Sequence, residues 1–90
     1  AVIYVDKYGN AISNIDNTLI KEIGKGREFH IGFVQKGYEM TEIKKRYSDV
    51  PLGDRLALMN SAGHLEIAIN QGHAANLLGL HTGATVIMTF

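Results

Sequence analysis

Residues Leu56–Ile69 read LALMNSAGHLEIAI, and this stretch gives the clearest indication of the fold. It contains two short apolar runs, Leu56–Met59 and Leu65–Ile69, which the turn residues Asn60–Gly63 separate. Two strand-like runs joined by a short turn that contains glycine are typical of a β-hairpin. The sequence therefore predicts an antiparallel pair of strands in this part of the chain.

Further short strands are predicted on both sides of this hairpin. Runs rich in β-branched and aromatic residues cover Ala1–Asp6, Ala11–Ile15, Glu28–Val34, Met40–Tyr47 and Val86–Phe90. Asn17–Gly26 fits a helical turn or a loop, Ser48–Asp54 fits a loop, and His73–Leu78 fits a short helix with Gly79 as its left-handed C-cap. About seven strands and one short helix predict an all-β fold, a small closed or nearly closed antiparallel barrel.

The composition is that of one ordinary globular domain. The 90 residues are 46% hydrophobic and 20% charged, and nine basic residues balance nine acidic ones. A neutral chain argues against a nucleic-acid partner and against an electrostatic membrane anchor. No apolar run reaches the roughly 18 residues of a membrane span, and the absence of cysteine fits a reducing, cytoplasmic setting. Because the chain begins at Ala1 inside a strand-like run, we expect residues 1–90 to be one domain of a longer protein.

The charged residues that could carry chemistry show no metal-binding or phosphate-binding pattern. The four histidines, His30, His64, His73 and His81, lack the spacing of metal ligands, so we expect no metal. The basic run Lys44-Lys45-Arg46 fits a solvated face or an interface better than a phosphate site.

The segment Asp6-Lys7-Tyr8-Gly9-Asn10 has two interpretations. Gly-Asn is a common hairpin turn, and an aspartate before it can cap that turn. Alternatively, the segment is part of a binding site, because a carboxamide such as that of Asn10 suits the edge of an adenine and a tyrosine ring such as that of Tyr8 stacks on a base. Asn60–Gly63 and Asn70–Gly72 are two more polar turns, and a pocket forms if the three turns meet beside the start of the predicted helix.

At these residues the chain resembles the C-terminal domain of the S-adenosylmethionine hydroxide adenosyltransferases, the family that includes the fluorinating and chlorinating enzymes. The resemblance rests on VIYVDKYGNAISNI (2–15), on RYSDVPLGDRLALMNSAGHLEIAINQGHAANLLGL (46–80) and on the terminal G-x-x-V at Gly83–Val86. These segments occur in the family's order and cover nearly the whole chain.

The resemblance implies a small-molecule site with no cofactor beyond the substrate. Family members cleave S-adenosylmethionine by attack of hydroxide or halide on the 5′ carbon, in a homotrimer whose sites lie between the C-terminal domain of one chain and the N-terminal domain of its neighbour. By position, Asp6 would meet the methionine ammonium, Tyr8 and Tyr47 would border the adenine, and Asn10 would bond its edge. Ser61 would hold the methionine carboxylate, and backbone groups around Ile69, Asn70 and Gln71 would contact the adenine. No catalytic residue falls in this chain, so the domain alone is expected to be inactive.

The chain departs from the halogenating members in two places. The turn DKYGN is shorter than theirs, which favours the hydroxide-using branch. Ala62 stands where they carry an arginine, so the carboxylate contact would rest on Ser61 and neighbouring amides. Two other function classes stay open at this point: a non-catalytic β-barrel binding module, for example a single-strand nucleic-acid barrel, and a purely structural oligomerisation domain.

Overall fold

The structure is a computed structural model that describes residues 1–24, 28–33 and 37–89. The strands in these ranges are β1 (Val2–Val5), β2 (Ala11–Asp16), β3 (His30–Phe33), β4 (Ile43–Lys44), β5 (Arg55–Met59), β6 (His64–Ile69) and β7 (Val86–Thr89). The helical segments are α1 (Asn17–Leu19), which continues into the π-helical turn Ile20–Gly24, the 3-10 turn Tyr47–Asp49, and α2 (Ala74–Leu78). The all-β prediction is therefore confirmed for the described residues. Val34, Phe90 and residues 25–26, which belonged to predicted elements, lie outside them.

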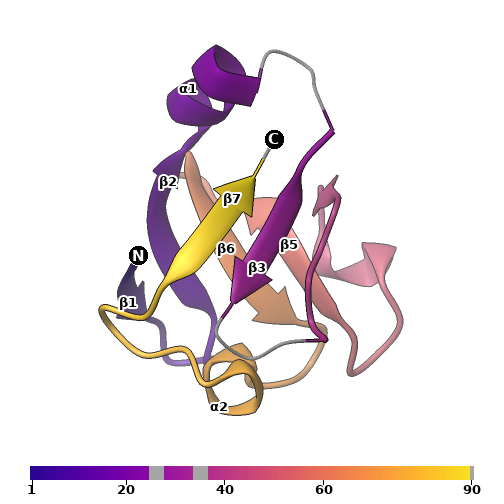
Figure 1. Ribbon diagram of the computed structural model, residues 1–90. Coiled ribbons are helices and arrows are strands. Elements are labelled where there is room, and N and C mark those ends of the chain that lie inside the picture. Colours follow the sequence, from indigo (N-terminus) through magenta and orange to yellow (C-terminus); the bar gives the residue numbers. More distant parts are fainter. Residues whose placement is uncertain (25–27, 34–36, 90) are drawn as a thin grey trace.

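The strands form two sheets that face each other. One has the order β1-β2-β6-β5-β4, and the other pairs β3 with β7. In Figure 1 the β3–β7 pair crosses in front of the larger sheet, α2 lies at one end of the molecule and α1 at the other. The predicted hairpin is confirmed, because β5 and β6 pair antiparallel from Arg55↔Ile69 to Met59↔Leu65.

The predicted closed barrel is not confirmed, since no continuous ladder joins the two sheets in the described ranges. Instead, on each side a strand of one sheet is hydrogen-bonded to the segment that precedes an edge strand of the other. On one side Ile31 and Met40 exchange backbone hydrogen bonds of 2.7 and 2.9 Å. On the other, Val2 bonds to Ala84 and Gly83 at 2.9 and 2.8 Å. The result is two stacked sheets that are linked by a few backbone hydrogen bonds on each side.

The long strand predicted over Met40–Tyr47 is wrong. Only Ile43–Lys44 pairs with β5, and this pair is parallel, whereas an antiparallel arrangement was expected. The physical reason is Asp49, whose carboxylate accepts the backbone N–H groups of Lys45 and Arg46 at 3.1 and 3.3 Å and turns the chain away from the sheet.

The larger sheet is covered on both faces. Its inner face packs on β3, β7 and α2 through a core that includes Leu65, Ile67 and Ile69 of β6. On its outer face, Leu56, Leu58 and Ala68 form a smaller cluster beneath Val50, so the segment after β4 covers this part of the sheet. Since β6 is the central strand, every residue of its LEIAI run is buried.

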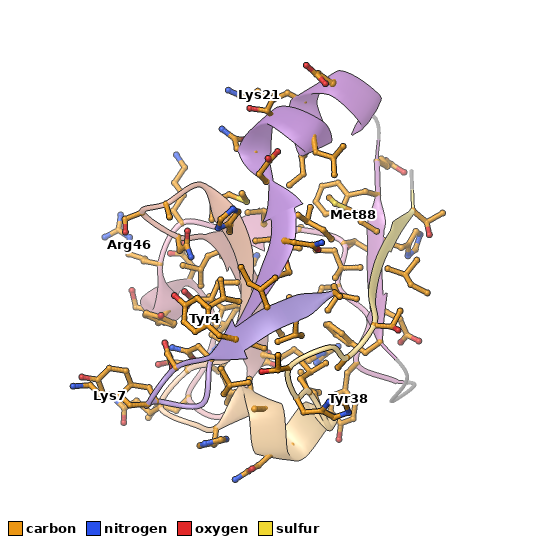
Figure 2. The ribbon with its side chains drawn as sticks, turned by 90° about the vertical axis from the view of Figure 1, so that its left-hand side faces the viewer. Tyr4, Lys7, Lys21, Tyr38, Arg46 and Met88 are labelled. Atoms are coloured by element: carbon orange, nitrogen blue, oxygen red, sulfur yellow. The ribbon has the colours of Figure 1, made fainter. Side chains whose placement is uncertain are left out.

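One row of side chains crosses the outer face. The register places Tyr4, Ile12, Glu66, Leu58 and Lys44 opposite one another across the five strands. Figure 2 shows Tyr4 on the side of the molecule that faces away from Met88 of β7, together with Lys7 and Arg46. None of the helices within the described ranges combines the length and the apolar character that crossing a bilayer requires.

Candidate functional site

A pocket of about 540 Å³ lies where β6 ends, at the edge of the outer face. The register Ala11↔Ile67 brings the start of β2 beside the end of β6, so the turns that precede Ala11 and follow Ile69 meet there. The lining residues are Tyr8, Asn10, Tyr47, Ile69, Asn70, Gln71 and Gly72. Six of the eight residues that the sequence singled out for ligand binding therefore share one pocket.

The β1–β2 turn is held by Asp6. Its Oδ1 accepts the backbone N–H groups of Tyr8 and Asn10 at 2.9 and 3.0 Å, and its backbone carbonyl accepts that of Gly9 at 3.0 Å. The turn-capping interpretation of this aspartate is thus confirmed. A role for its carboxylate toward an ammonium group stays a prediction, and Asp6 does not line the pocket.

Gly9 allows this turn to lie directly against the start of α2. Its φ is +82°, and a Cβ there would come within 2.2 Å of the His73 ring. The Gly9 carbonyl accepts the N–H of Ala75 at 2.8 Å, while His73 Nδ1 accepts that of Asn76 at 3.2 Å. The N–H groups of Ala75 and Asn76 at the start of the helix therefore both have hydrogen-bond partners within the chain.

Asn10 is the most buried polar residue of the pocket, with 7% of its surface exposed. Its Nδ2 donates to Asp6 Oδ2 at 3.1 Å and to the Tyr47 hydroxyl at 3.4 Å. Because a carboxylate only accepts hydrogen bonds, the amide nitrogen must face Asp6. The Oδ1 of Asn10 is then the atom left for a ligand.

Tyr47 connects the pocket to a buried acid. Its hydroxyl donates to Glu66 Oε2 at 2.6 Å, and Glu66 is only 6% exposed. Burial, the hydrogen bond to Glu66 and the negative charges of Glu66 and Asp6 raise the pKa of Tyr47 to about 12. The phenol therefore stays protonated at neutral pH and keeps donating to Glu66.

No role for Glu66 was predicted from the sequence. The signal was present, because an acidic residue inside the apolar run LEIAI is costly to bury and requires a partner. That partner is Tyr47, which is 19 positions earlier in the chain, so only the fold identifies it.

The turn after β6 is tied to the loop before β5. Asn70 Nδ2 donates to the Val50 carbonyl at 2.9 Å, and the backbone N–H and C=O of Asn70 bond to Asp54 and Gly53 at 2.9 and 2.8 Å. Both backbone groups of Asn70 thus have partners within the chain. Gln71 follows with a φ of +56°, an unusual conformation for a residue other than glycine.

Tyr8 and Ser61, two other predicted site residues, differ in their surroundings. Tyr8 lines the pocket and is 67% exposed, with Lys7 Nζ 5.2 Å from its ring centroid. Ser61 does not line the pocket. It lies in the β5–β6 turn, at the opposite end of β6 from Asn70, so two of the three polar turns meet and the third does not.

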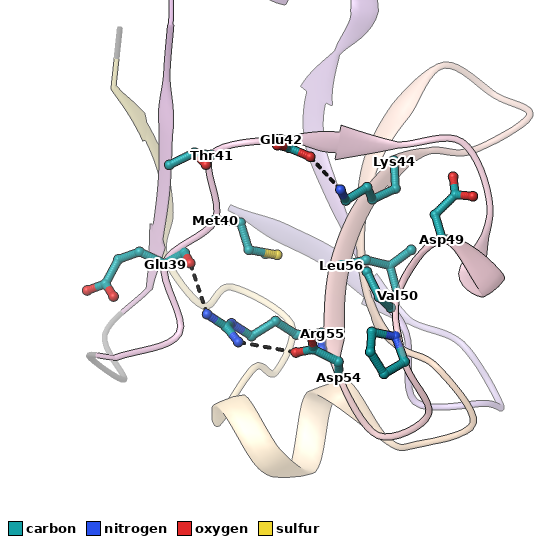
Figure 3. A pocket seen from close by; sticks show the side chains of 11 residues that line it. Glu39, Met40, Thr41, Glu42, Lys44, Asp49, Val50, Asp54, Arg55 and Leu56 are labelled. Carbon is teal, nitrogen blue, oxygen red and sulfur yellow. Dashed lines mark hydrogen bonds and ion pairs between the residues drawn. The ribbon is translucent and has the colours of Figure 1, made fainter.

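A second pocket, of about 400 Å³, lies between the segment Glu39–Lys44 and the start of β5. Figure 3 shows four of its charged side chains in two pairs: Lys44 with Glu42, and Arg55 with Asp54. Arg55 also donates to the backbone carbonyls of Tyr38 and Glu39 at 3.0 and 3.2 Å. These charges stabilise the loop, and none of the predicted site residues lies there. The part of the chain that the structure describes also contains no cluster of three or more His, Asp or Glu side chains suited to a metal ion.

Comparison with known proteins points to one family. Residues 1–87 match the family described as "SAM hydroxide adenosyltransferase C-terminal domain". A protein of Thermus thermophilus named (R)-S-adenosyl-L-methionine hydrolase is 35% identical over 85 residues, which are 94% of this chain and 29% of that protein.

Solved structures give the same fold. An uncharacterized conserved protein from Thermotoga maritima superposes with a TM-score of 0.80 at 29% identity, over 97% of this chain and 34% of its own. A conserved hypothetical protein from Thermus thermophilus superposes with a TM-score of 0.68 at 27% identity, over 97% of this chain and 33% of its own. The chain thus spans about a third of the length of these relatives.

Proposed function

Because this chain belongs to the S-adenosylmethionine hydroxide adenosyltransferase family, as a C-terminal domain, we propose that it forms the adenine-binding wall of a site in which hydroxide cleaves S-adenosylmethionine. The observation that carries this proposal is the pocket at the end of β6, which Asn10, with a free amide oxygen, lines together with the two tyrosines Tyr8 and Tyr47. An amide oxygen accepts from an exocyclic amino group, and tyrosine rings stack on a base.

The proposed reaction suits a wall made of positioning groups. Hydroxide attacks the 5′ carbon, the carbon–sulfur bond breaks, and its electron pair goes to the sulfonium, which leaves as the neutral thioether of methionine. The other product is adenosine. Because a neutral thioether needs no proton to depart, the main demands are in-line orientation and desolvation of the nucleophile. The proposal requires no cofactor and assigns no acid or base to this chain.

The rest of the site is proposed to come from another domain. Tyr8 is 67% exposed, so a further surface can close over it and over a bound base. We place there the N-terminal domain of a neighbouring chain in a homotrimer, in line with the family resemblance. The domain by itself is then inactive, and light scattering of the intact protein tests the trimer.

Ser61 fits this proposal only if the ligand lies along the sheet. Its turn is separated from the pocket by β6, whose six residues span about 20 Å. We propose that the base occupies the pocket and the amino-acid part extends along β6 toward Ser61. Because the ammonium and carboxylate of methionine are bonded to one carbon atom, Asp6, beside the pocket, and Ser61 cannot hold both groups of one substrate. Asp6 as the contact of the ammonium group is therefore the alternative proposal, in which the amino-acid part stays near the pocket.

The test supplies the intact protein with S-adenosylmethionine and follows adenosine and methionine by chromatography. We expect both products in equal amounts. The variant Asn10→Ala should lose about 1–3 kcal/mol of adenosine binding, because it removes the amide that bonds the base. Unchanged affinity in a folded Asn10→Ala protein would show that the pocket does not hold adenine. Absence of adenosine binding by the wild type would leave the structural oligomerisation domain as the better interpretation.

A further inference from the structure

Glu66 is a buried acid that the proposed function does not use. It lies on the central strand β6, between the buried residues Leu65 and Ile67, and does not line the pocket. Its Oε2 accepts the hydroxyl proton of Tyr47 at 2.6 Å, within the range of short charge-assisted hydrogen bonds. This contact decides which groups the pocket can offer to a ligand.

A phenol hydroxyl has one proton, and in this structure Tyr47 uses that proton to donate its hydrogen bond to Glu66. The Tyr47 oxygen can then only accept, and it does so from Asn10 Nδ2 at 3.4 Å. The second hydrogen of that nitrogen goes to Asp6 Oδ2 at 3.1 Å. The Asn10–Tyr47 pair is therefore left with acceptors alone on its free side, namely Asn10 Oδ1 and the remaining lone pair of the Tyr47 oxygen.

We propose that Glu66 is a positioning residue that sets the base specificity of the pocket. By holding the Tyr47 proton, it makes the Asn10–Tyr47 pair complementary to a 6-aminopurine and repulsive to a 6-oxopurine, which presents an oxygen at the same place. Without an acceptor at position 66, the Tyr47 hydroxyl is free to donate into the pocket, and a 6-oxopurine gains a hydrogen bond. This inference rests on the proposed nucleoside site and adds to it the residue that controls the choice of base.

The test compares three ribosides on the intact protein by titration calorimetry: adenosine, inosine and purine riboside, which has no substituent at C6. For the wild type we expect adenosine to bind about tenfold or more tightly than inosine, because unpaired polar groups in a binding site discriminate strongly. The affinity of purine riboside should lie between the two, since it lacks the amino group that donates to the pocket but has no oxygen that the pocket acceptors would repel. This order needs no variant, and inosine binding as tightly as purine riboside overturns the inference.

Variants then separate Glu66 from the rest of the pocket. Glu66→Met, which removes the acceptor at similar size, should reduce the adenosine-to-inosine ratio about fivefold or more, mainly through tighter inosine binding. Glu66→Gln keeps an oxygen that can accept the Tyr47 proton and should retain the wild-type ratio. In the double variant Glu66→Met/Tyr47→Phe, the adenosine-to-inosine ratio should return toward the wild-type value, because the Tyr47 hydroxyl that could donate to inosine is absent. A merely structural role of Glu66 would weaken both ligands together.

Glu22→Met provides the matched control, because Glu22 is exposed in the turn after α1 and loses the same charge. It should leave all three affinities unchanged. A wild-type ratio in folded Glu66→Met overturns the inference while leaving the nucleoside site intact. A wild type that binds none of the three ribosides overturns the site itself and the inference with it.

Discussion

The turns at the two ends of β6, Asn60–Gly63 and Asn70–Gly72, are similar in sequence and different in their surroundings. In the first, Asn60 Oδ1 accepts the N–H groups of Ala62 and His64 at 3.0 Å each, so the turn is held mainly by its own residues. In the second, Asn70 bonds to Val50, Gly53 and Asp54. The register of β2 with β6 then adds Asn10 to this second end and not to the first. Strand pairing also brings Asn17 beside the first turn, where its N–H donates to the Gly63 carbonyl at 2.9 Å, but the pocket forms at the second end, where the polar β1–β2 turn lies alongside.

The largest expected effect comes from two glycines with nearly the same backbone conformation. Gly9, at the pocket end, has a φ of +82°, and Gly63, at the Ser61 end, has a φ of +83°. Alanine costs roughly 1–2 kcal/mol at either position because of the left-handed backbone. At Gly9 the new Cβ also overlaps the His73 ring, which adds about 1–3 kcal/mol to the loss of unfolding free energy. At Gly63 no atom lies within 4 Å of the new Cβ.

Urea unfolding of Gly9→Ala and Gly63→Ala measures this difference directly, with Gly63→Ala as the matched control. Equal losses of unfolding free energy in the two variants would mean that the β1–β2 turn does not press against the start of α2.

The second prediction concerns what each end binds. Ser61→Ala should weaken binding of S-adenosylmethionine about threefold to tenfold, by loss of one hydrogen bond, and should leave adenosine binding unchanged. Asn10→Ala should weaken both ligands. Calorimetric titration of both variants with both ligands provides the measurement. If Ser61→Ala weakens adenosine as much as S-adenosylmethionine, the ligand does not lie along β6 as proposed.

The sequence was sufficient for features that depend on neighbouring residues. The β5–β6 hairpin, the Asp6 cap of the β1–β2 turn and Gly79 as the C-cap of α2, with a φ of +66°, all follow from local patterns. The strand over Met40–Tyr47 was wrong because Asp49, beyond its end, competes for the backbone N–H groups of Lys45 and Arg46.

Features that depend on long-range pairing were beyond the sequence. The contact between Tyr47 and Glu66 and the bond from Asn10 to Tyr47, which crosses 37 positions, require the folded sheet. The separation of Ser61 from the pocket likewise follows from the length and direction of β6. The family resemblance predicted a set of site residues, and the strand register showed which of them lie together.

The third prediction concerns the alkaline stability of the pocket end. The pKa of Tyr47 is raised to about 12 in the folded chain, above the ordinary value of 10. The folded state therefore favours the protonated phenol, and its stabilising effect is complete below pH 10 and lost as the pH rises toward 12. Because Tyr47 is 40% exposed and solvent screens its interactions, we expect a loss of only about 1 kcal/mol.

Urea unfolding at a series of pH values between 9 and 12 tests this, with Tyr47→Phe as the control that lacks the titrating group. The difference in unfolding free energy between wild type and Tyr47→Phe should shrink across this range. A constant difference would mean that the Tyr47 hydroxyl ionises alike in the folded and unfolded chains.

The smallest expected effect is a gain in stability at the pocket end. Gln71 has a φ of +56°, a conformation that side chains disfavour and glycine adopts freely. Gln71→Gly should relieve this strain and raise the unfolding free energy by about 0.5 kcal/mol, since the greater flexibility of the unfolded glycine offsets part of the gain. Ser61→Gly, in the turn where Gly63 already supplies the positive φ, lacks this relief and should lower stability. If urea unfolding shows the two glycine variants losing equal stability, the Gln71 backbone carries no strain, and the pocket end differs from the Ser61 end in its contacts alone.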